Sequence, residues 1–236
     1  MIDWINMFNM ILSFDYNPLY ISFKLAFITT IILFFIALPF SWYLAFTKSK
    51  MKPFLEALTA MPLVVPPTVL GFYLLWGLSS NSIIGSFFYD TFGIKLVFNF
   101  YALIIASCIY SFPFMVQPIQ SGFESLNKHM LEASYLSGKS KFTTLFKIAL
   151  PNIKPSLLTA LIITFAHTIG EFGIVLMVGG SIPNETKVAA IAIYEFVEVL
   201  DYEKAHIYSF IMIFVSFLTL VSVYMINGKL KQSRFV

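Results

Sequence analysis

Five long apolar runs constrain the fold of this chain more than any other feature. A helix needs about 20 apolar residues to cross the roughly 30 Å hydrocarbon core of a membrane. Apolar residues make up 58% of the 236-residue chain and charged residues only 11%. The sequence therefore predicts an all-α polytopic membrane protein, formed by residues 1–236 as a single transmembrane domain. The five predicted core transmembrane helices are 19–46, 57–78, 101–122, 156–179 and 205–227.

The N-terminal residues precede the first of these runs. They lack the basic region of a signal peptide and carry Asp3 and Asp15, so no cleaved targeting segment is expected. The segment 4–14 is too short and too polar to span a membrane, and it is interpreted as an additional interfacial helix. The single cysteine, Cys108, excludes an internal disulfide and is interpreted as a small packing residue.

The basic residues predict how the five spans are oriented. Cytoplasmic loops of membrane proteins are enriched in lysine and arginine. Most of the 15 basic residues fall between spans one and two, between spans three and four, or after span five. They are Lys48, Lys50, Lys52, Lys128, Lys139, Lys141, Lys147, Lys154, Lys229, Lys231 and Arg234. We therefore expect a multi-pass protein of the cytoplasmic (inner) membrane with the N-terminus outside, the C-terminus in the cytoplasm and segment 124–155 on the cytoplasmic side.

The octapeptide ASYLSGKS (133–140) lies in that segment and raises the question of ATP binding. A phosphate-binding loop reads G-x-x-x-x-G-K-[ST] and follows a β-strand. Here Ala133 occupies the first glycine position, and the residues before it are not those of a buried strand. Without an α/β scaffold, the backbone N–H groups cannot be positioned around a phosphate. We expect no nucleotide to bind to this stretch.

A helix–turn–helix explains the stretch better. Asn127 is a plausible N-cap for a helix over 128–137, and Gly138 can adopt the left-handed conformation that ends it. Ser140 can cap a second helix with one apolar face, formed by Phe142, Leu145, Phe146 and Ala149. A first helix that exposes Leu131, Tyr135 and Leu136 would fit a groove of another protein.

The spacing of this stretch resembles the "EAA" loop of ABC importer permeases, which reads EAA, three residues, G, nine residues, I-x-LP. The chain departs from that pattern only at Ser134, which replaces the second alanine. In that family the loop docks on a cytoplasmic ATPase subunit. The resemblance implies that segment 124–155 is a coupling loop, that ATP and Mg²⁺ bind to the partner ATPase, and that this chain binds no cofactor and is not an enzyme. The implied coupling residues are Glu132, Ala133, Ser134, Tyr135, Leu136, Gly138, Ile148, Leu150 and Pro151.

Three further stretches resemble the molybdate-type permeases, with sulfate permeases as the nearest relatives. They are MPLVVPPTVLGFYLL (61–75), SFPFMVQPIQSGFESL (111–126) and IGEFGIVLMVGGSIPNETKVAAIAIYEFVE (169–198). The resemblance implies the type I ABC importer permease fold and import of molybdate by alternating access. It also implies a homodimer in membrane lipid, with an ATPase dimer below it, an extracytoplasmic oxyanion-binding protein above it and no nucleic acid partner. Sulfate and tungstate stay open as alternative cargoes.

Residues that interrupt the spans are candidates for a translocation path or gate. Broken helices are tolerated at membrane depth where they pack on protein or line an aqueous path. Hydroxyl and amide groups could contact an oxyanion weakly enough to release it. Ordinary helix kinks and hydrogen bonds within a helix are the alternative interpretation. The candidates are Pro66, Pro67, Thr68, Ser111, Gln117, Thr168, Gly170, Glu171 and Gly173, with Ser107 and Thr164 as further hydroxyl groups.

Glu171 is an unusual residue for a membrane span. An intramembrane carboxylate indicates a functional role, but an ionised carboxylate would repel an oxyanion. We therefore expect Glu171 to serve a gate or the structure and not to contact the cargo. His167 shares its helix face, but two ligands are too few for a metal site and the HExxH pattern is absent.

Two other classes of protein fit the sequence less well. An intramembrane hydrolase would need a nucleophile and a base, such as Ser111 with His167, but no span contains G-x-S-x-G. A self-sufficient secondary transporter would usually show two related halves, and no repetition is visible here.

Overall fold

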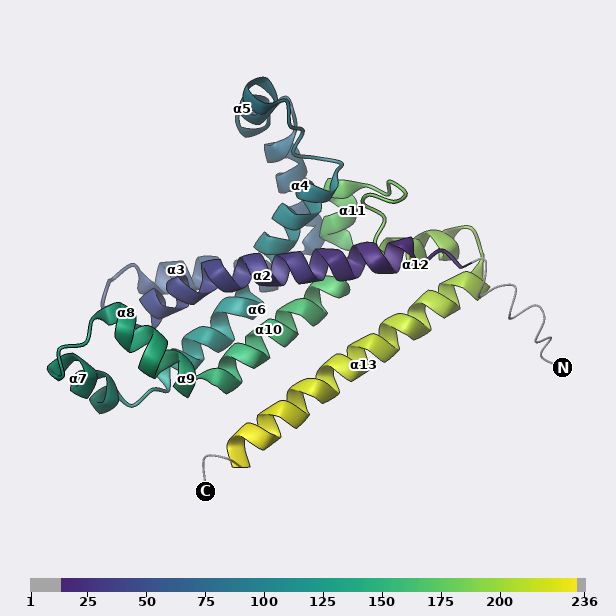
Figure 1. The fold of residues 1–236 in the computed structure, drawn as a ribbon. Coiled ribbons are helices and arrows are strands. Elements are labelled where there is room, and N and C mark those ends of the chain that lie inside the picture. The colour runs from purple at the N-terminus through teal and green to yellow at the C-terminus, as the bar shows by residue number, and fades with distance from the viewer. Residues whose placement is uncertain (1–13, 233–236) are drawn as a thin grey trace.

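The computed structural model describes residues 14–232, and every regular element in that range is a helix (Figure 1). The predicted interfacial helix at 4–14 falls almost entirely on residues 1–13, outside the described residues. The helices are α2 (Asn17–Phe46), α3 (Lys52–Ala60), η1 (Met61–Leu63), α4 (Pro67–Leu78), α5 (Ile83–Phe92), α6 (Phe100–Glu124), α7 (Lys128–Leu136), α8 (Lys141–Thr144), η2 (Leu145–Ala149), α9 (Leu150–Asn152), α10 (Lys154–Ile169), α11 (Gly173–Gly179), α12 (Ala189–Glu198) and α13 (Tyr202–Gln232).

Two of the five predicted spans are not continuous helices. Over the described residues, three helices are long and apolar enough to cross a membrane: Asn17–Phe46, Phe100–Glu124 and Tyr202–Ser222. The count rises to five only if each of two bent helix pairs is one span. The first pair, Lys52–Leu63 and Pro67–Leu78, bends by 105°, and the second, Lys141–Asn152 and Lys154–Ile169, bends by 78°.

Proline explains the first bend. Pro66 has an extended backbone (φ −54°, ψ 138°) between η1 and α4. A proline disfavours helical geometry at the residue before it and has no N–H to donate. The consecutive prolines Pro66 and Pro67 therefore stop one helix and start the next. The second bend lies at Ile153, before the predicted span 156–179. That span is divided at another place, because α10 ends at Ile169 and α11 begins at Gly173.

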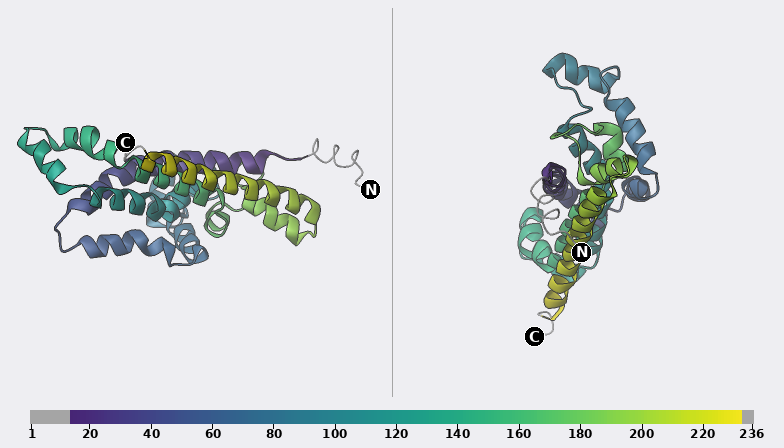
Figure 2. Two further views of the ribbon diagram at one scale, coloured as in Figure 1. Left: turned by 90° about the horizontal axis from the view of Figure 1, so that it is seen from below. Right: turned by 90° about the vertical axis from the view of Figure 1, so that its right-hand side faces the viewer.

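Helices α2, α6 and α10 pack together and form the main core. One buried cluster joins Leu33 and Leu44 of α2 to Met115 and Phe123 of α6 and Ala160 of α10. Its interhelical contacts are reinforced by a hydrogen bond in which the Ser41 hydroxyl of α2 donates to the carbonyl oxygen of Val116, at 3.1 Å. Helix α13 is a long helix that packs against α10 and α12, and α7 and α8 extend beyond its C-terminal end (Figure 2).

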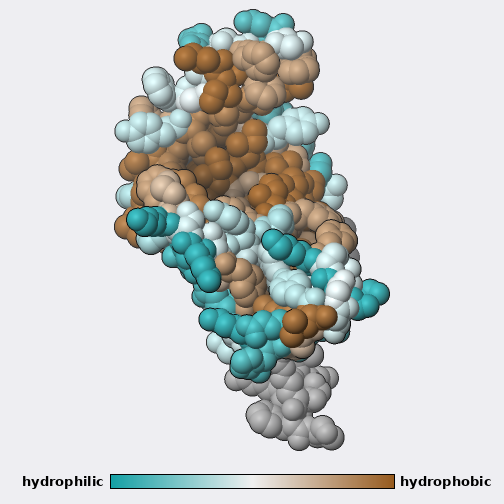
Figure 3. Space-filling view, turned by 90° about the vertical axis from the view of Figure 1, so that its left-hand side faces the viewer, coloured by the Kyte–Doolittle hydropathy of each residue, from teal (hydrophilic) through white to brown (hydrophobic). Residues whose placement is uncertain are grey.

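Helices α4 and α5 project from this core, as the right-hand view of Figure 2 shows. They expose large apolar side chains, including Trp76 at 70% and Ile83 at 91%. Figure 3 views the end of the molecule that carries α7 and α8. Hydrophilic side chains gather in the lower part of this face, and hydrophobic side chains cover its upper part. An apolar surface of this extent is stable where lipid or another protein covers it, which agrees with a membrane location.

Candidate functional site

The predicted coupling loop folds as two short helices with defined ends. The Asn127 side chain accepts a hydrogen bond from the His129 backbone N–H at 2.9 Å, which confirms the predicted N-cap of α7. Gly138 has φ +72°, which confirms the predicted left-handed turn. The Ser140 hydroxyl accepts from the Thr143 backbone N–H at 3.2 Å and caps α8 as predicted. Local sequence signals therefore define where both helices begin and how they are joined.

Ser134, where the chain departs from the EAA pattern, connects the two helices. Its hydroxyl is buried and lies 2.8 Å from the Thr144 hydroxyl of α8. On the same side of α7, Leu131 is buried in the cluster that contains Ala149 and Ile153. The prediction that α7 exposes Leu131 is therefore wrong: Leu131 anchors the loop to the core.

The second helix differs from the prediction as well. Residues Leu145–Ala149 form a π-helix, which places more residues in each turn than an α-helix does. The predicted apolar face of Phe142, Leu145, Phe146 and Ala149 therefore lies on a short α-helix and a π-helix, not on one continuous α-helix. Ala149 is buried, whereas Phe142 and Phe146 are exposed with their ring centroids 4.5 Å apart.

The outer surface of α7 carries four of the nine predicted coupling residues: Glu132, Ala133, Tyr135 and Leu136. Leu136 is 89% exposed and Tyr135 is 42% exposed. Glu132 lies 3.3 Å from the Nδ1 atom of His129, one turn earlier on the same helix. Ala133, Gly138 and Pro151 are also exposed, whereas Ile148 and Leu150 are half-buried. Tyr135 and Leu136 therefore form a small exposed apolar surface on α7, while the buried Leu131 and Ser134 hold the opposite side of the helix in place.

Gly138 allows a direct test of the turn between α7 and α8. Its surroundings are open, because a Cβ added there would meet nothing within 4 Å. The cost of Gly138→Val is therefore expected to come from the backbone alone, about 1–2 kcal/mol for a left-handed residue that is not glycine. Gly138→Asn is the matched control, since asparagine tolerates this conformation. Amide hydrogen exchange of residues 128–144 should rise in the valine variant and much less in the asparagine variant; equal rates in both would contradict this account.

A second group of predicted residues surrounds the break between α10 and α11. Glu171 is 4% exposed and accepts hydrogen bonds from the hydroxyls of Ser111, at 2.7 Å, and of Ser107, both on α6. The Ser111 hydroxyl also lies 2.9 Å from that of Thr168. The structure thus brings Ser107, Ser111, Thr168 and Glu171 together, and their bonds hold the break against α6.

His167 joins this group without completing a catalytic triad. Its Nδ1 atom lies 2.9 Å from the Ser111 hydroxyl and 3.6 Å from the Glu171 carboxylate. In a serine hydrolase, the acid contacts the opposite ring nitrogen from the one that faces the nucleophile. Here the same nitrogen faces both groups, and the serine hydroxyl donates directly to the carboxylate. Among the described residues, no three His, Cys, Asp or Glu side chains are grouped so that they could hold a metal ion.

The two helix breaks lie against each other. A Cβ added to Gly173, at the start of α11, would lie 3.2 Å from the Cβ of Pro67 and 3.7 Å from the Cγ2 of Thr68. Nearby, a Cβ added to Gly71 would lie 2.8 Å from the Cβ of Met177. Glycine at both positions therefore lets α4 and α11 approach closely. As a consequence, Gly173 lies next to Pro67 and Thr68 in space. Pro66 and Gly170, which are close to these residues in sequence, are both exposed.

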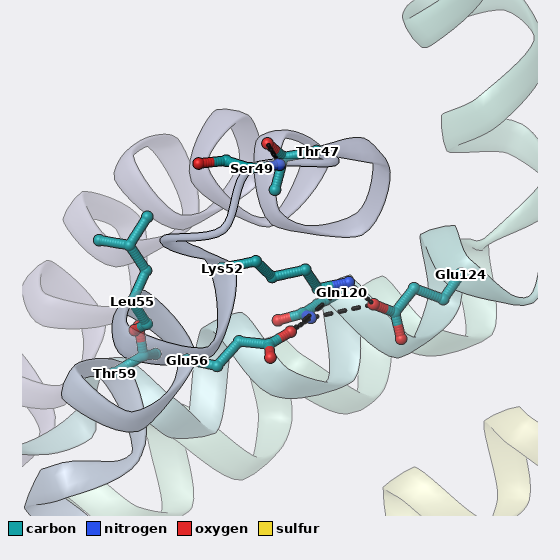
Figure 4. Close-up of polar contacts among 8 residues, drawn as sticks. All are labelled: Thr47, Ser49, Lys52, Leu55, Glu56, Thr59, Gln120 and Glu124. Atoms are coloured by element: carbon teal, nitrogen blue, oxygen red, sulfur yellow. Dashed lines mark hydrogen bonds and ion pairs between the residues drawn. The ribbon is translucent and has the colours of Figure 1, made fainter.

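Gln117 belongs to a different place. It is exposed and lines a polar pocket of about 300 Å³ between α3 and α6. The other lining residues are Glu56, Thr59, Ala60, Gln120 and Ser121. Beside the pocket, Lys52, Glu56, Gln120 and Glu124 form a polar network (Figure 4). The predicted path residues are therefore divided between the meeting point of the breaks and this pocket.

Comparison with known proteins identifies the family. A family model described as "Binding-protein-dependent transport system inner membrane component" matches residues 37–233. The chain belongs to this family. The family assignment confirms the predicted ABC importer permease of molybdate type, an inner-membrane transport subunit and not an enzyme.

Several curated relatives of the permease cover most of its length. The molybdenum transport system permease protein ModB of Azotobacter vinelandii is 40% identical over 210 residues, which are 89% of this chain and 93% of that protein. ModB of Escherichia coli (strain K12) is 31% identical over 159 residues, which are 67% of this chain and 69% of that protein. A probable sulfate transport system permease protein, cysT of Chlorella vulgaris, is 29% identical over 181 residues, which are 77% of this chain and 68% of that protein.

Solved structures show the same fold at low sequence identity. A chain of the inward-facing MetNI methionine ABC transporter has a TM-score of 0.69 at 17% identity, and the match covers 90% of the permease and 94% of that chain. A chain of a bacterial ABC transporter that imports the acidic polysaccharide alginate has a TM-score of 0.76 at 14% identity, covering 95% and 83%. These matches support the predicted type I ABC importer fold and do not bear on cargo.

Sequence reasoning missed the network of Lys52, Glu56, Gln120 and Glu124 in the permease. A signal was present, because Lys52 and Glu56, like Gln120 and Glu124, are four residues apart and share a helix face. Charged and amide groups near the end of an apolar helix also need partners. The pairing between the two helices, however, joins positions 72 residues apart and could not be read from either segment alone.

Proposed function

We propose that this chain is the transmembrane subunit of an ATP-driven importer that moves molybdate, or a similar tetrahedral oxyanion, by alternating access. Two copies would enclose the path, with an ATPase dimer bound to the coupling loop and an oxyanion-binding protein on the outer side. The observation that carries the proposal is α7, a fixed helix with the EAA spacing that exposes Tyr135 and Leu136. Molybdate is favoured because a relative 40% identical over most of both chains is named as a molybdenum permease.

The proposed topology has five crossings: the three long helices, the bent pair Lys52–Leu63 with Pro67–Leu78, and α10 continued by α11. The N-terminus is outside, the C-terminus is in the cytoplasm, and residues 124–155 form the cytoplasmic coupling loop. The lysine-rich segments at one set of span ends support this orientation. A two-fold homodimer is favoured because five spans, two of them bent, can hardly enclose a gated path alone.

The polar groups available to the cargo suit passage better than retention. Lys24 is the only lysine or arginine within the five predicted spans, and its Nζ atom lies 4.5 Å from the centre of the Phe100 ring. Tight binding of a dianion would need arginine, lysine or several aligned N–H donors. Weak contacts with Thr68 and Gln117 permit release, so strong recognition is assigned to the binding protein.

The proposal is tested by reconstitution of the permease with its ATPase and binding protein in vesicles. We expect the ATPase to copurify and molybdate to accumulate only when ATP and the binding protein are present. Preferential uptake of sulfate or tungstate would revise the assignment of the cargo but leave the proposed transport mechanism unchanged. Uphill transport or ATP hydrolysis by this chain alone would contradict the proposal.

A further inference from the structure

Four polar side chains connect the start of α3 to the end of α6 (Figure 4). The Lys52 ammonium lies 3.0 Å from the Glu124 carboxylate and 3.6 Å from that of Glu56. The Gln120 amide donates to Glu56 at 2.6 Å and to Glu124 at 3.0 Å. Each carboxylate is therefore held by both a lysine and an amide, and each helix contributes two members of the network.

The α3 end of the network is held by a defined turn. The Ser49 backbone N–H donates to the Thr47 hydroxyl at 3.3 Å, and the Met51 N–H donates to the Ser49 hydroxyl at 3.1 Å. The Lys52 N–H donates to the Ser49 carbonyl at 3.1 Å. These bonds fix the entry to α3, so the lysine is presented to Glu124 from an ordered turn.

The α6 end of the network leads directly into the predicted coupling loop. Glu124 is the last residue of α6, and Asn127, the N-cap of α7, follows three positions later. Leu126 between them is buried in the same cluster as Leu131 of α7. A displacement of α7 would therefore act on Glu124 through a short and well-packed segment.

At its other end, α3 continues through η1 and the Pro66 break into α4. Helix α4 packs against α11, where the two helix breaks meet. The route from α7 to the breaks through α3 thus passes the polar junction between α6 and α3. A second route runs along α6 itself and ends at the hydrogen bonds of Ser107 and Ser111 to Glu171. Isolated exposed ion pairs contribute little to stability. A network that joins four groups across two helices therefore suggests that these residues fix the position of α3 relative to α6.

We propose that Lys52, Glu56, Gln120 and Glu124 are positioning residues that make α3 follow the end of α6, and so transmit movement of the coupling loop to the broken helix α3–α4. This inference rests on the proposed function, since it takes the loop to be the docking site of the ATPase. It assigns a role in coupling to three residues outside segment 124–155 and to Glu124 at its first position, none of them at the helix breaks.

The test compares charge reversals in the complete transporter reconstituted in vesicles. Lys52→Glu and Glu124→Lys each place like charges together, and the double variant restores an opposite pair. We expect each single reversal to lower the number of oxyanions imported per ATP hydrolysed by about fivefold or more, the lower end of ordinary coupling between sites. The double variant should recover most of that ratio. Lys204→Glu is the matched control, because it breaks the Lys204–Asp201 pair, which is 2.9 Å long against 3.0 Å for Lys52–Glu124 and lies away from this junction.

The ratio separates transmission from folding. A merely structural role would lower uptake and ATP hydrolysis together, in proportion to the amount of assembled complex, and would leave the ratio unchanged. An unchanged ratio in both single variants would overturn the proposal, as would a failure of the double variant to recover when it assembles normally. If a reversal prevents assembly, Lys52→Met, which removes the charge without repulsion, must lower the ratio.

A second readout is independent of cargo. Trapping the ATPase with vanadate should change amide hydrogen exchange in α3 of the unsubstituted transporter and not in Lys52→Glu. If the unsubstituted transporter imports no oxyanion, the proposed function fails, but a nucleotide-dependent change in α3 that Lys52→Glu abolishes would still support the junction. If α3 does not respond in the unsubstituted transporter, the junction fails by itself.

Discussion

Replacing Leu136 by aspartate is expected to release the ATPase subunit from the purified transporter. Leu136 is 89% exposed at the end of α7, so the substitution removes little packing within the chain. In the complex, a leucine at the tip of a docking helix is desolvated by its partner, and an aspartate there would be buried without a counter-charge. Loss of such a central contact costs about 2 kcal/mol or more, which corresponds to at least about 30-fold weaker binding.

Copurification of the ATPase with the tagged permease measures this effect. Val199→Asp is the matched control, because Val199 is 71% exposed and lies at the end of α12, outside the predicted coupling loop. Both variants should elute from a sizing column as folded permease, since exposed substitutions usually change stability by less than about 0.5 kcal/mol. If the ATPase binds Leu136→Asp as tightly as it binds the control variant, α7 is not part of the docking surface.

The ends and turns of the coupling loop could be predicted from sequence because their causes are local. A cap such as Asn127 acts on an N–H group two residues away, and the conformation of Gly138 depends on its missing side chain. The same holds for the break at Pro66, where the missing N–H acts within one turn. These features need no knowledge of what packs on them.

The burial of individual apolar residues could not be predicted in the same way. In a membrane helix both the core side and the lipid side are apolar, so the pattern lacks the polar face that orients a helix in a soluble protein. In α2, Leu25 is 1% exposed while Phe27 is 61% exposed, although both lie in one apolar run. Leu131 was misassigned for a related reason: its burial depends on Ala149 and Ile153, which are distant in sequence.

For the helix breaks, the sequence indicated which polar residues matter but not which of them pair with one another. Ser111 and Thr168 were singled out as hydroxyls that could contact an oxyanion weakly, and Glu171 as a carboxylate within a span. Which groups would pair depends on how α6 faces the break between α10 and α11, over a separation of 60 residues. The Glu171 carboxylate accepts its hydrogen bonds from α6, and its structural or gating role stays a prediction.

Glu171→Leu is expected to destabilise the transporter more than any other single change at the helix breaks. The leucine would remove the acceptor of the Ser107 and Ser111 hydroxyls inside the protein, and each buried hydroxyl left without a partner costs about 1–3 kcal/mol. Ser111 retains Thr168 as a partner, so Ser107 bears most of the loss. Glu171→Gln keeps an acceptor oxygen and the side-chain length, and a smaller loss of stability is expected.

The double variant Glu171→Leu with Ser107→Ala distinguishes this cause from simple loss of packing. Removing the orphaned hydroxyl should restore part of the midpoint temperature of unfolding, whereas two independent packing defects would add. Ser41→Ala, which removes one buried hydrogen bond far from the break, sets the scale at about 1 kcal/mol. If the double variant unfolds at a lower temperature than Glu171→Leu alone, these hydrogen bonds do not hold α6 against the break. The carboxylate would then be explained by a role in gating and not by a role in stability.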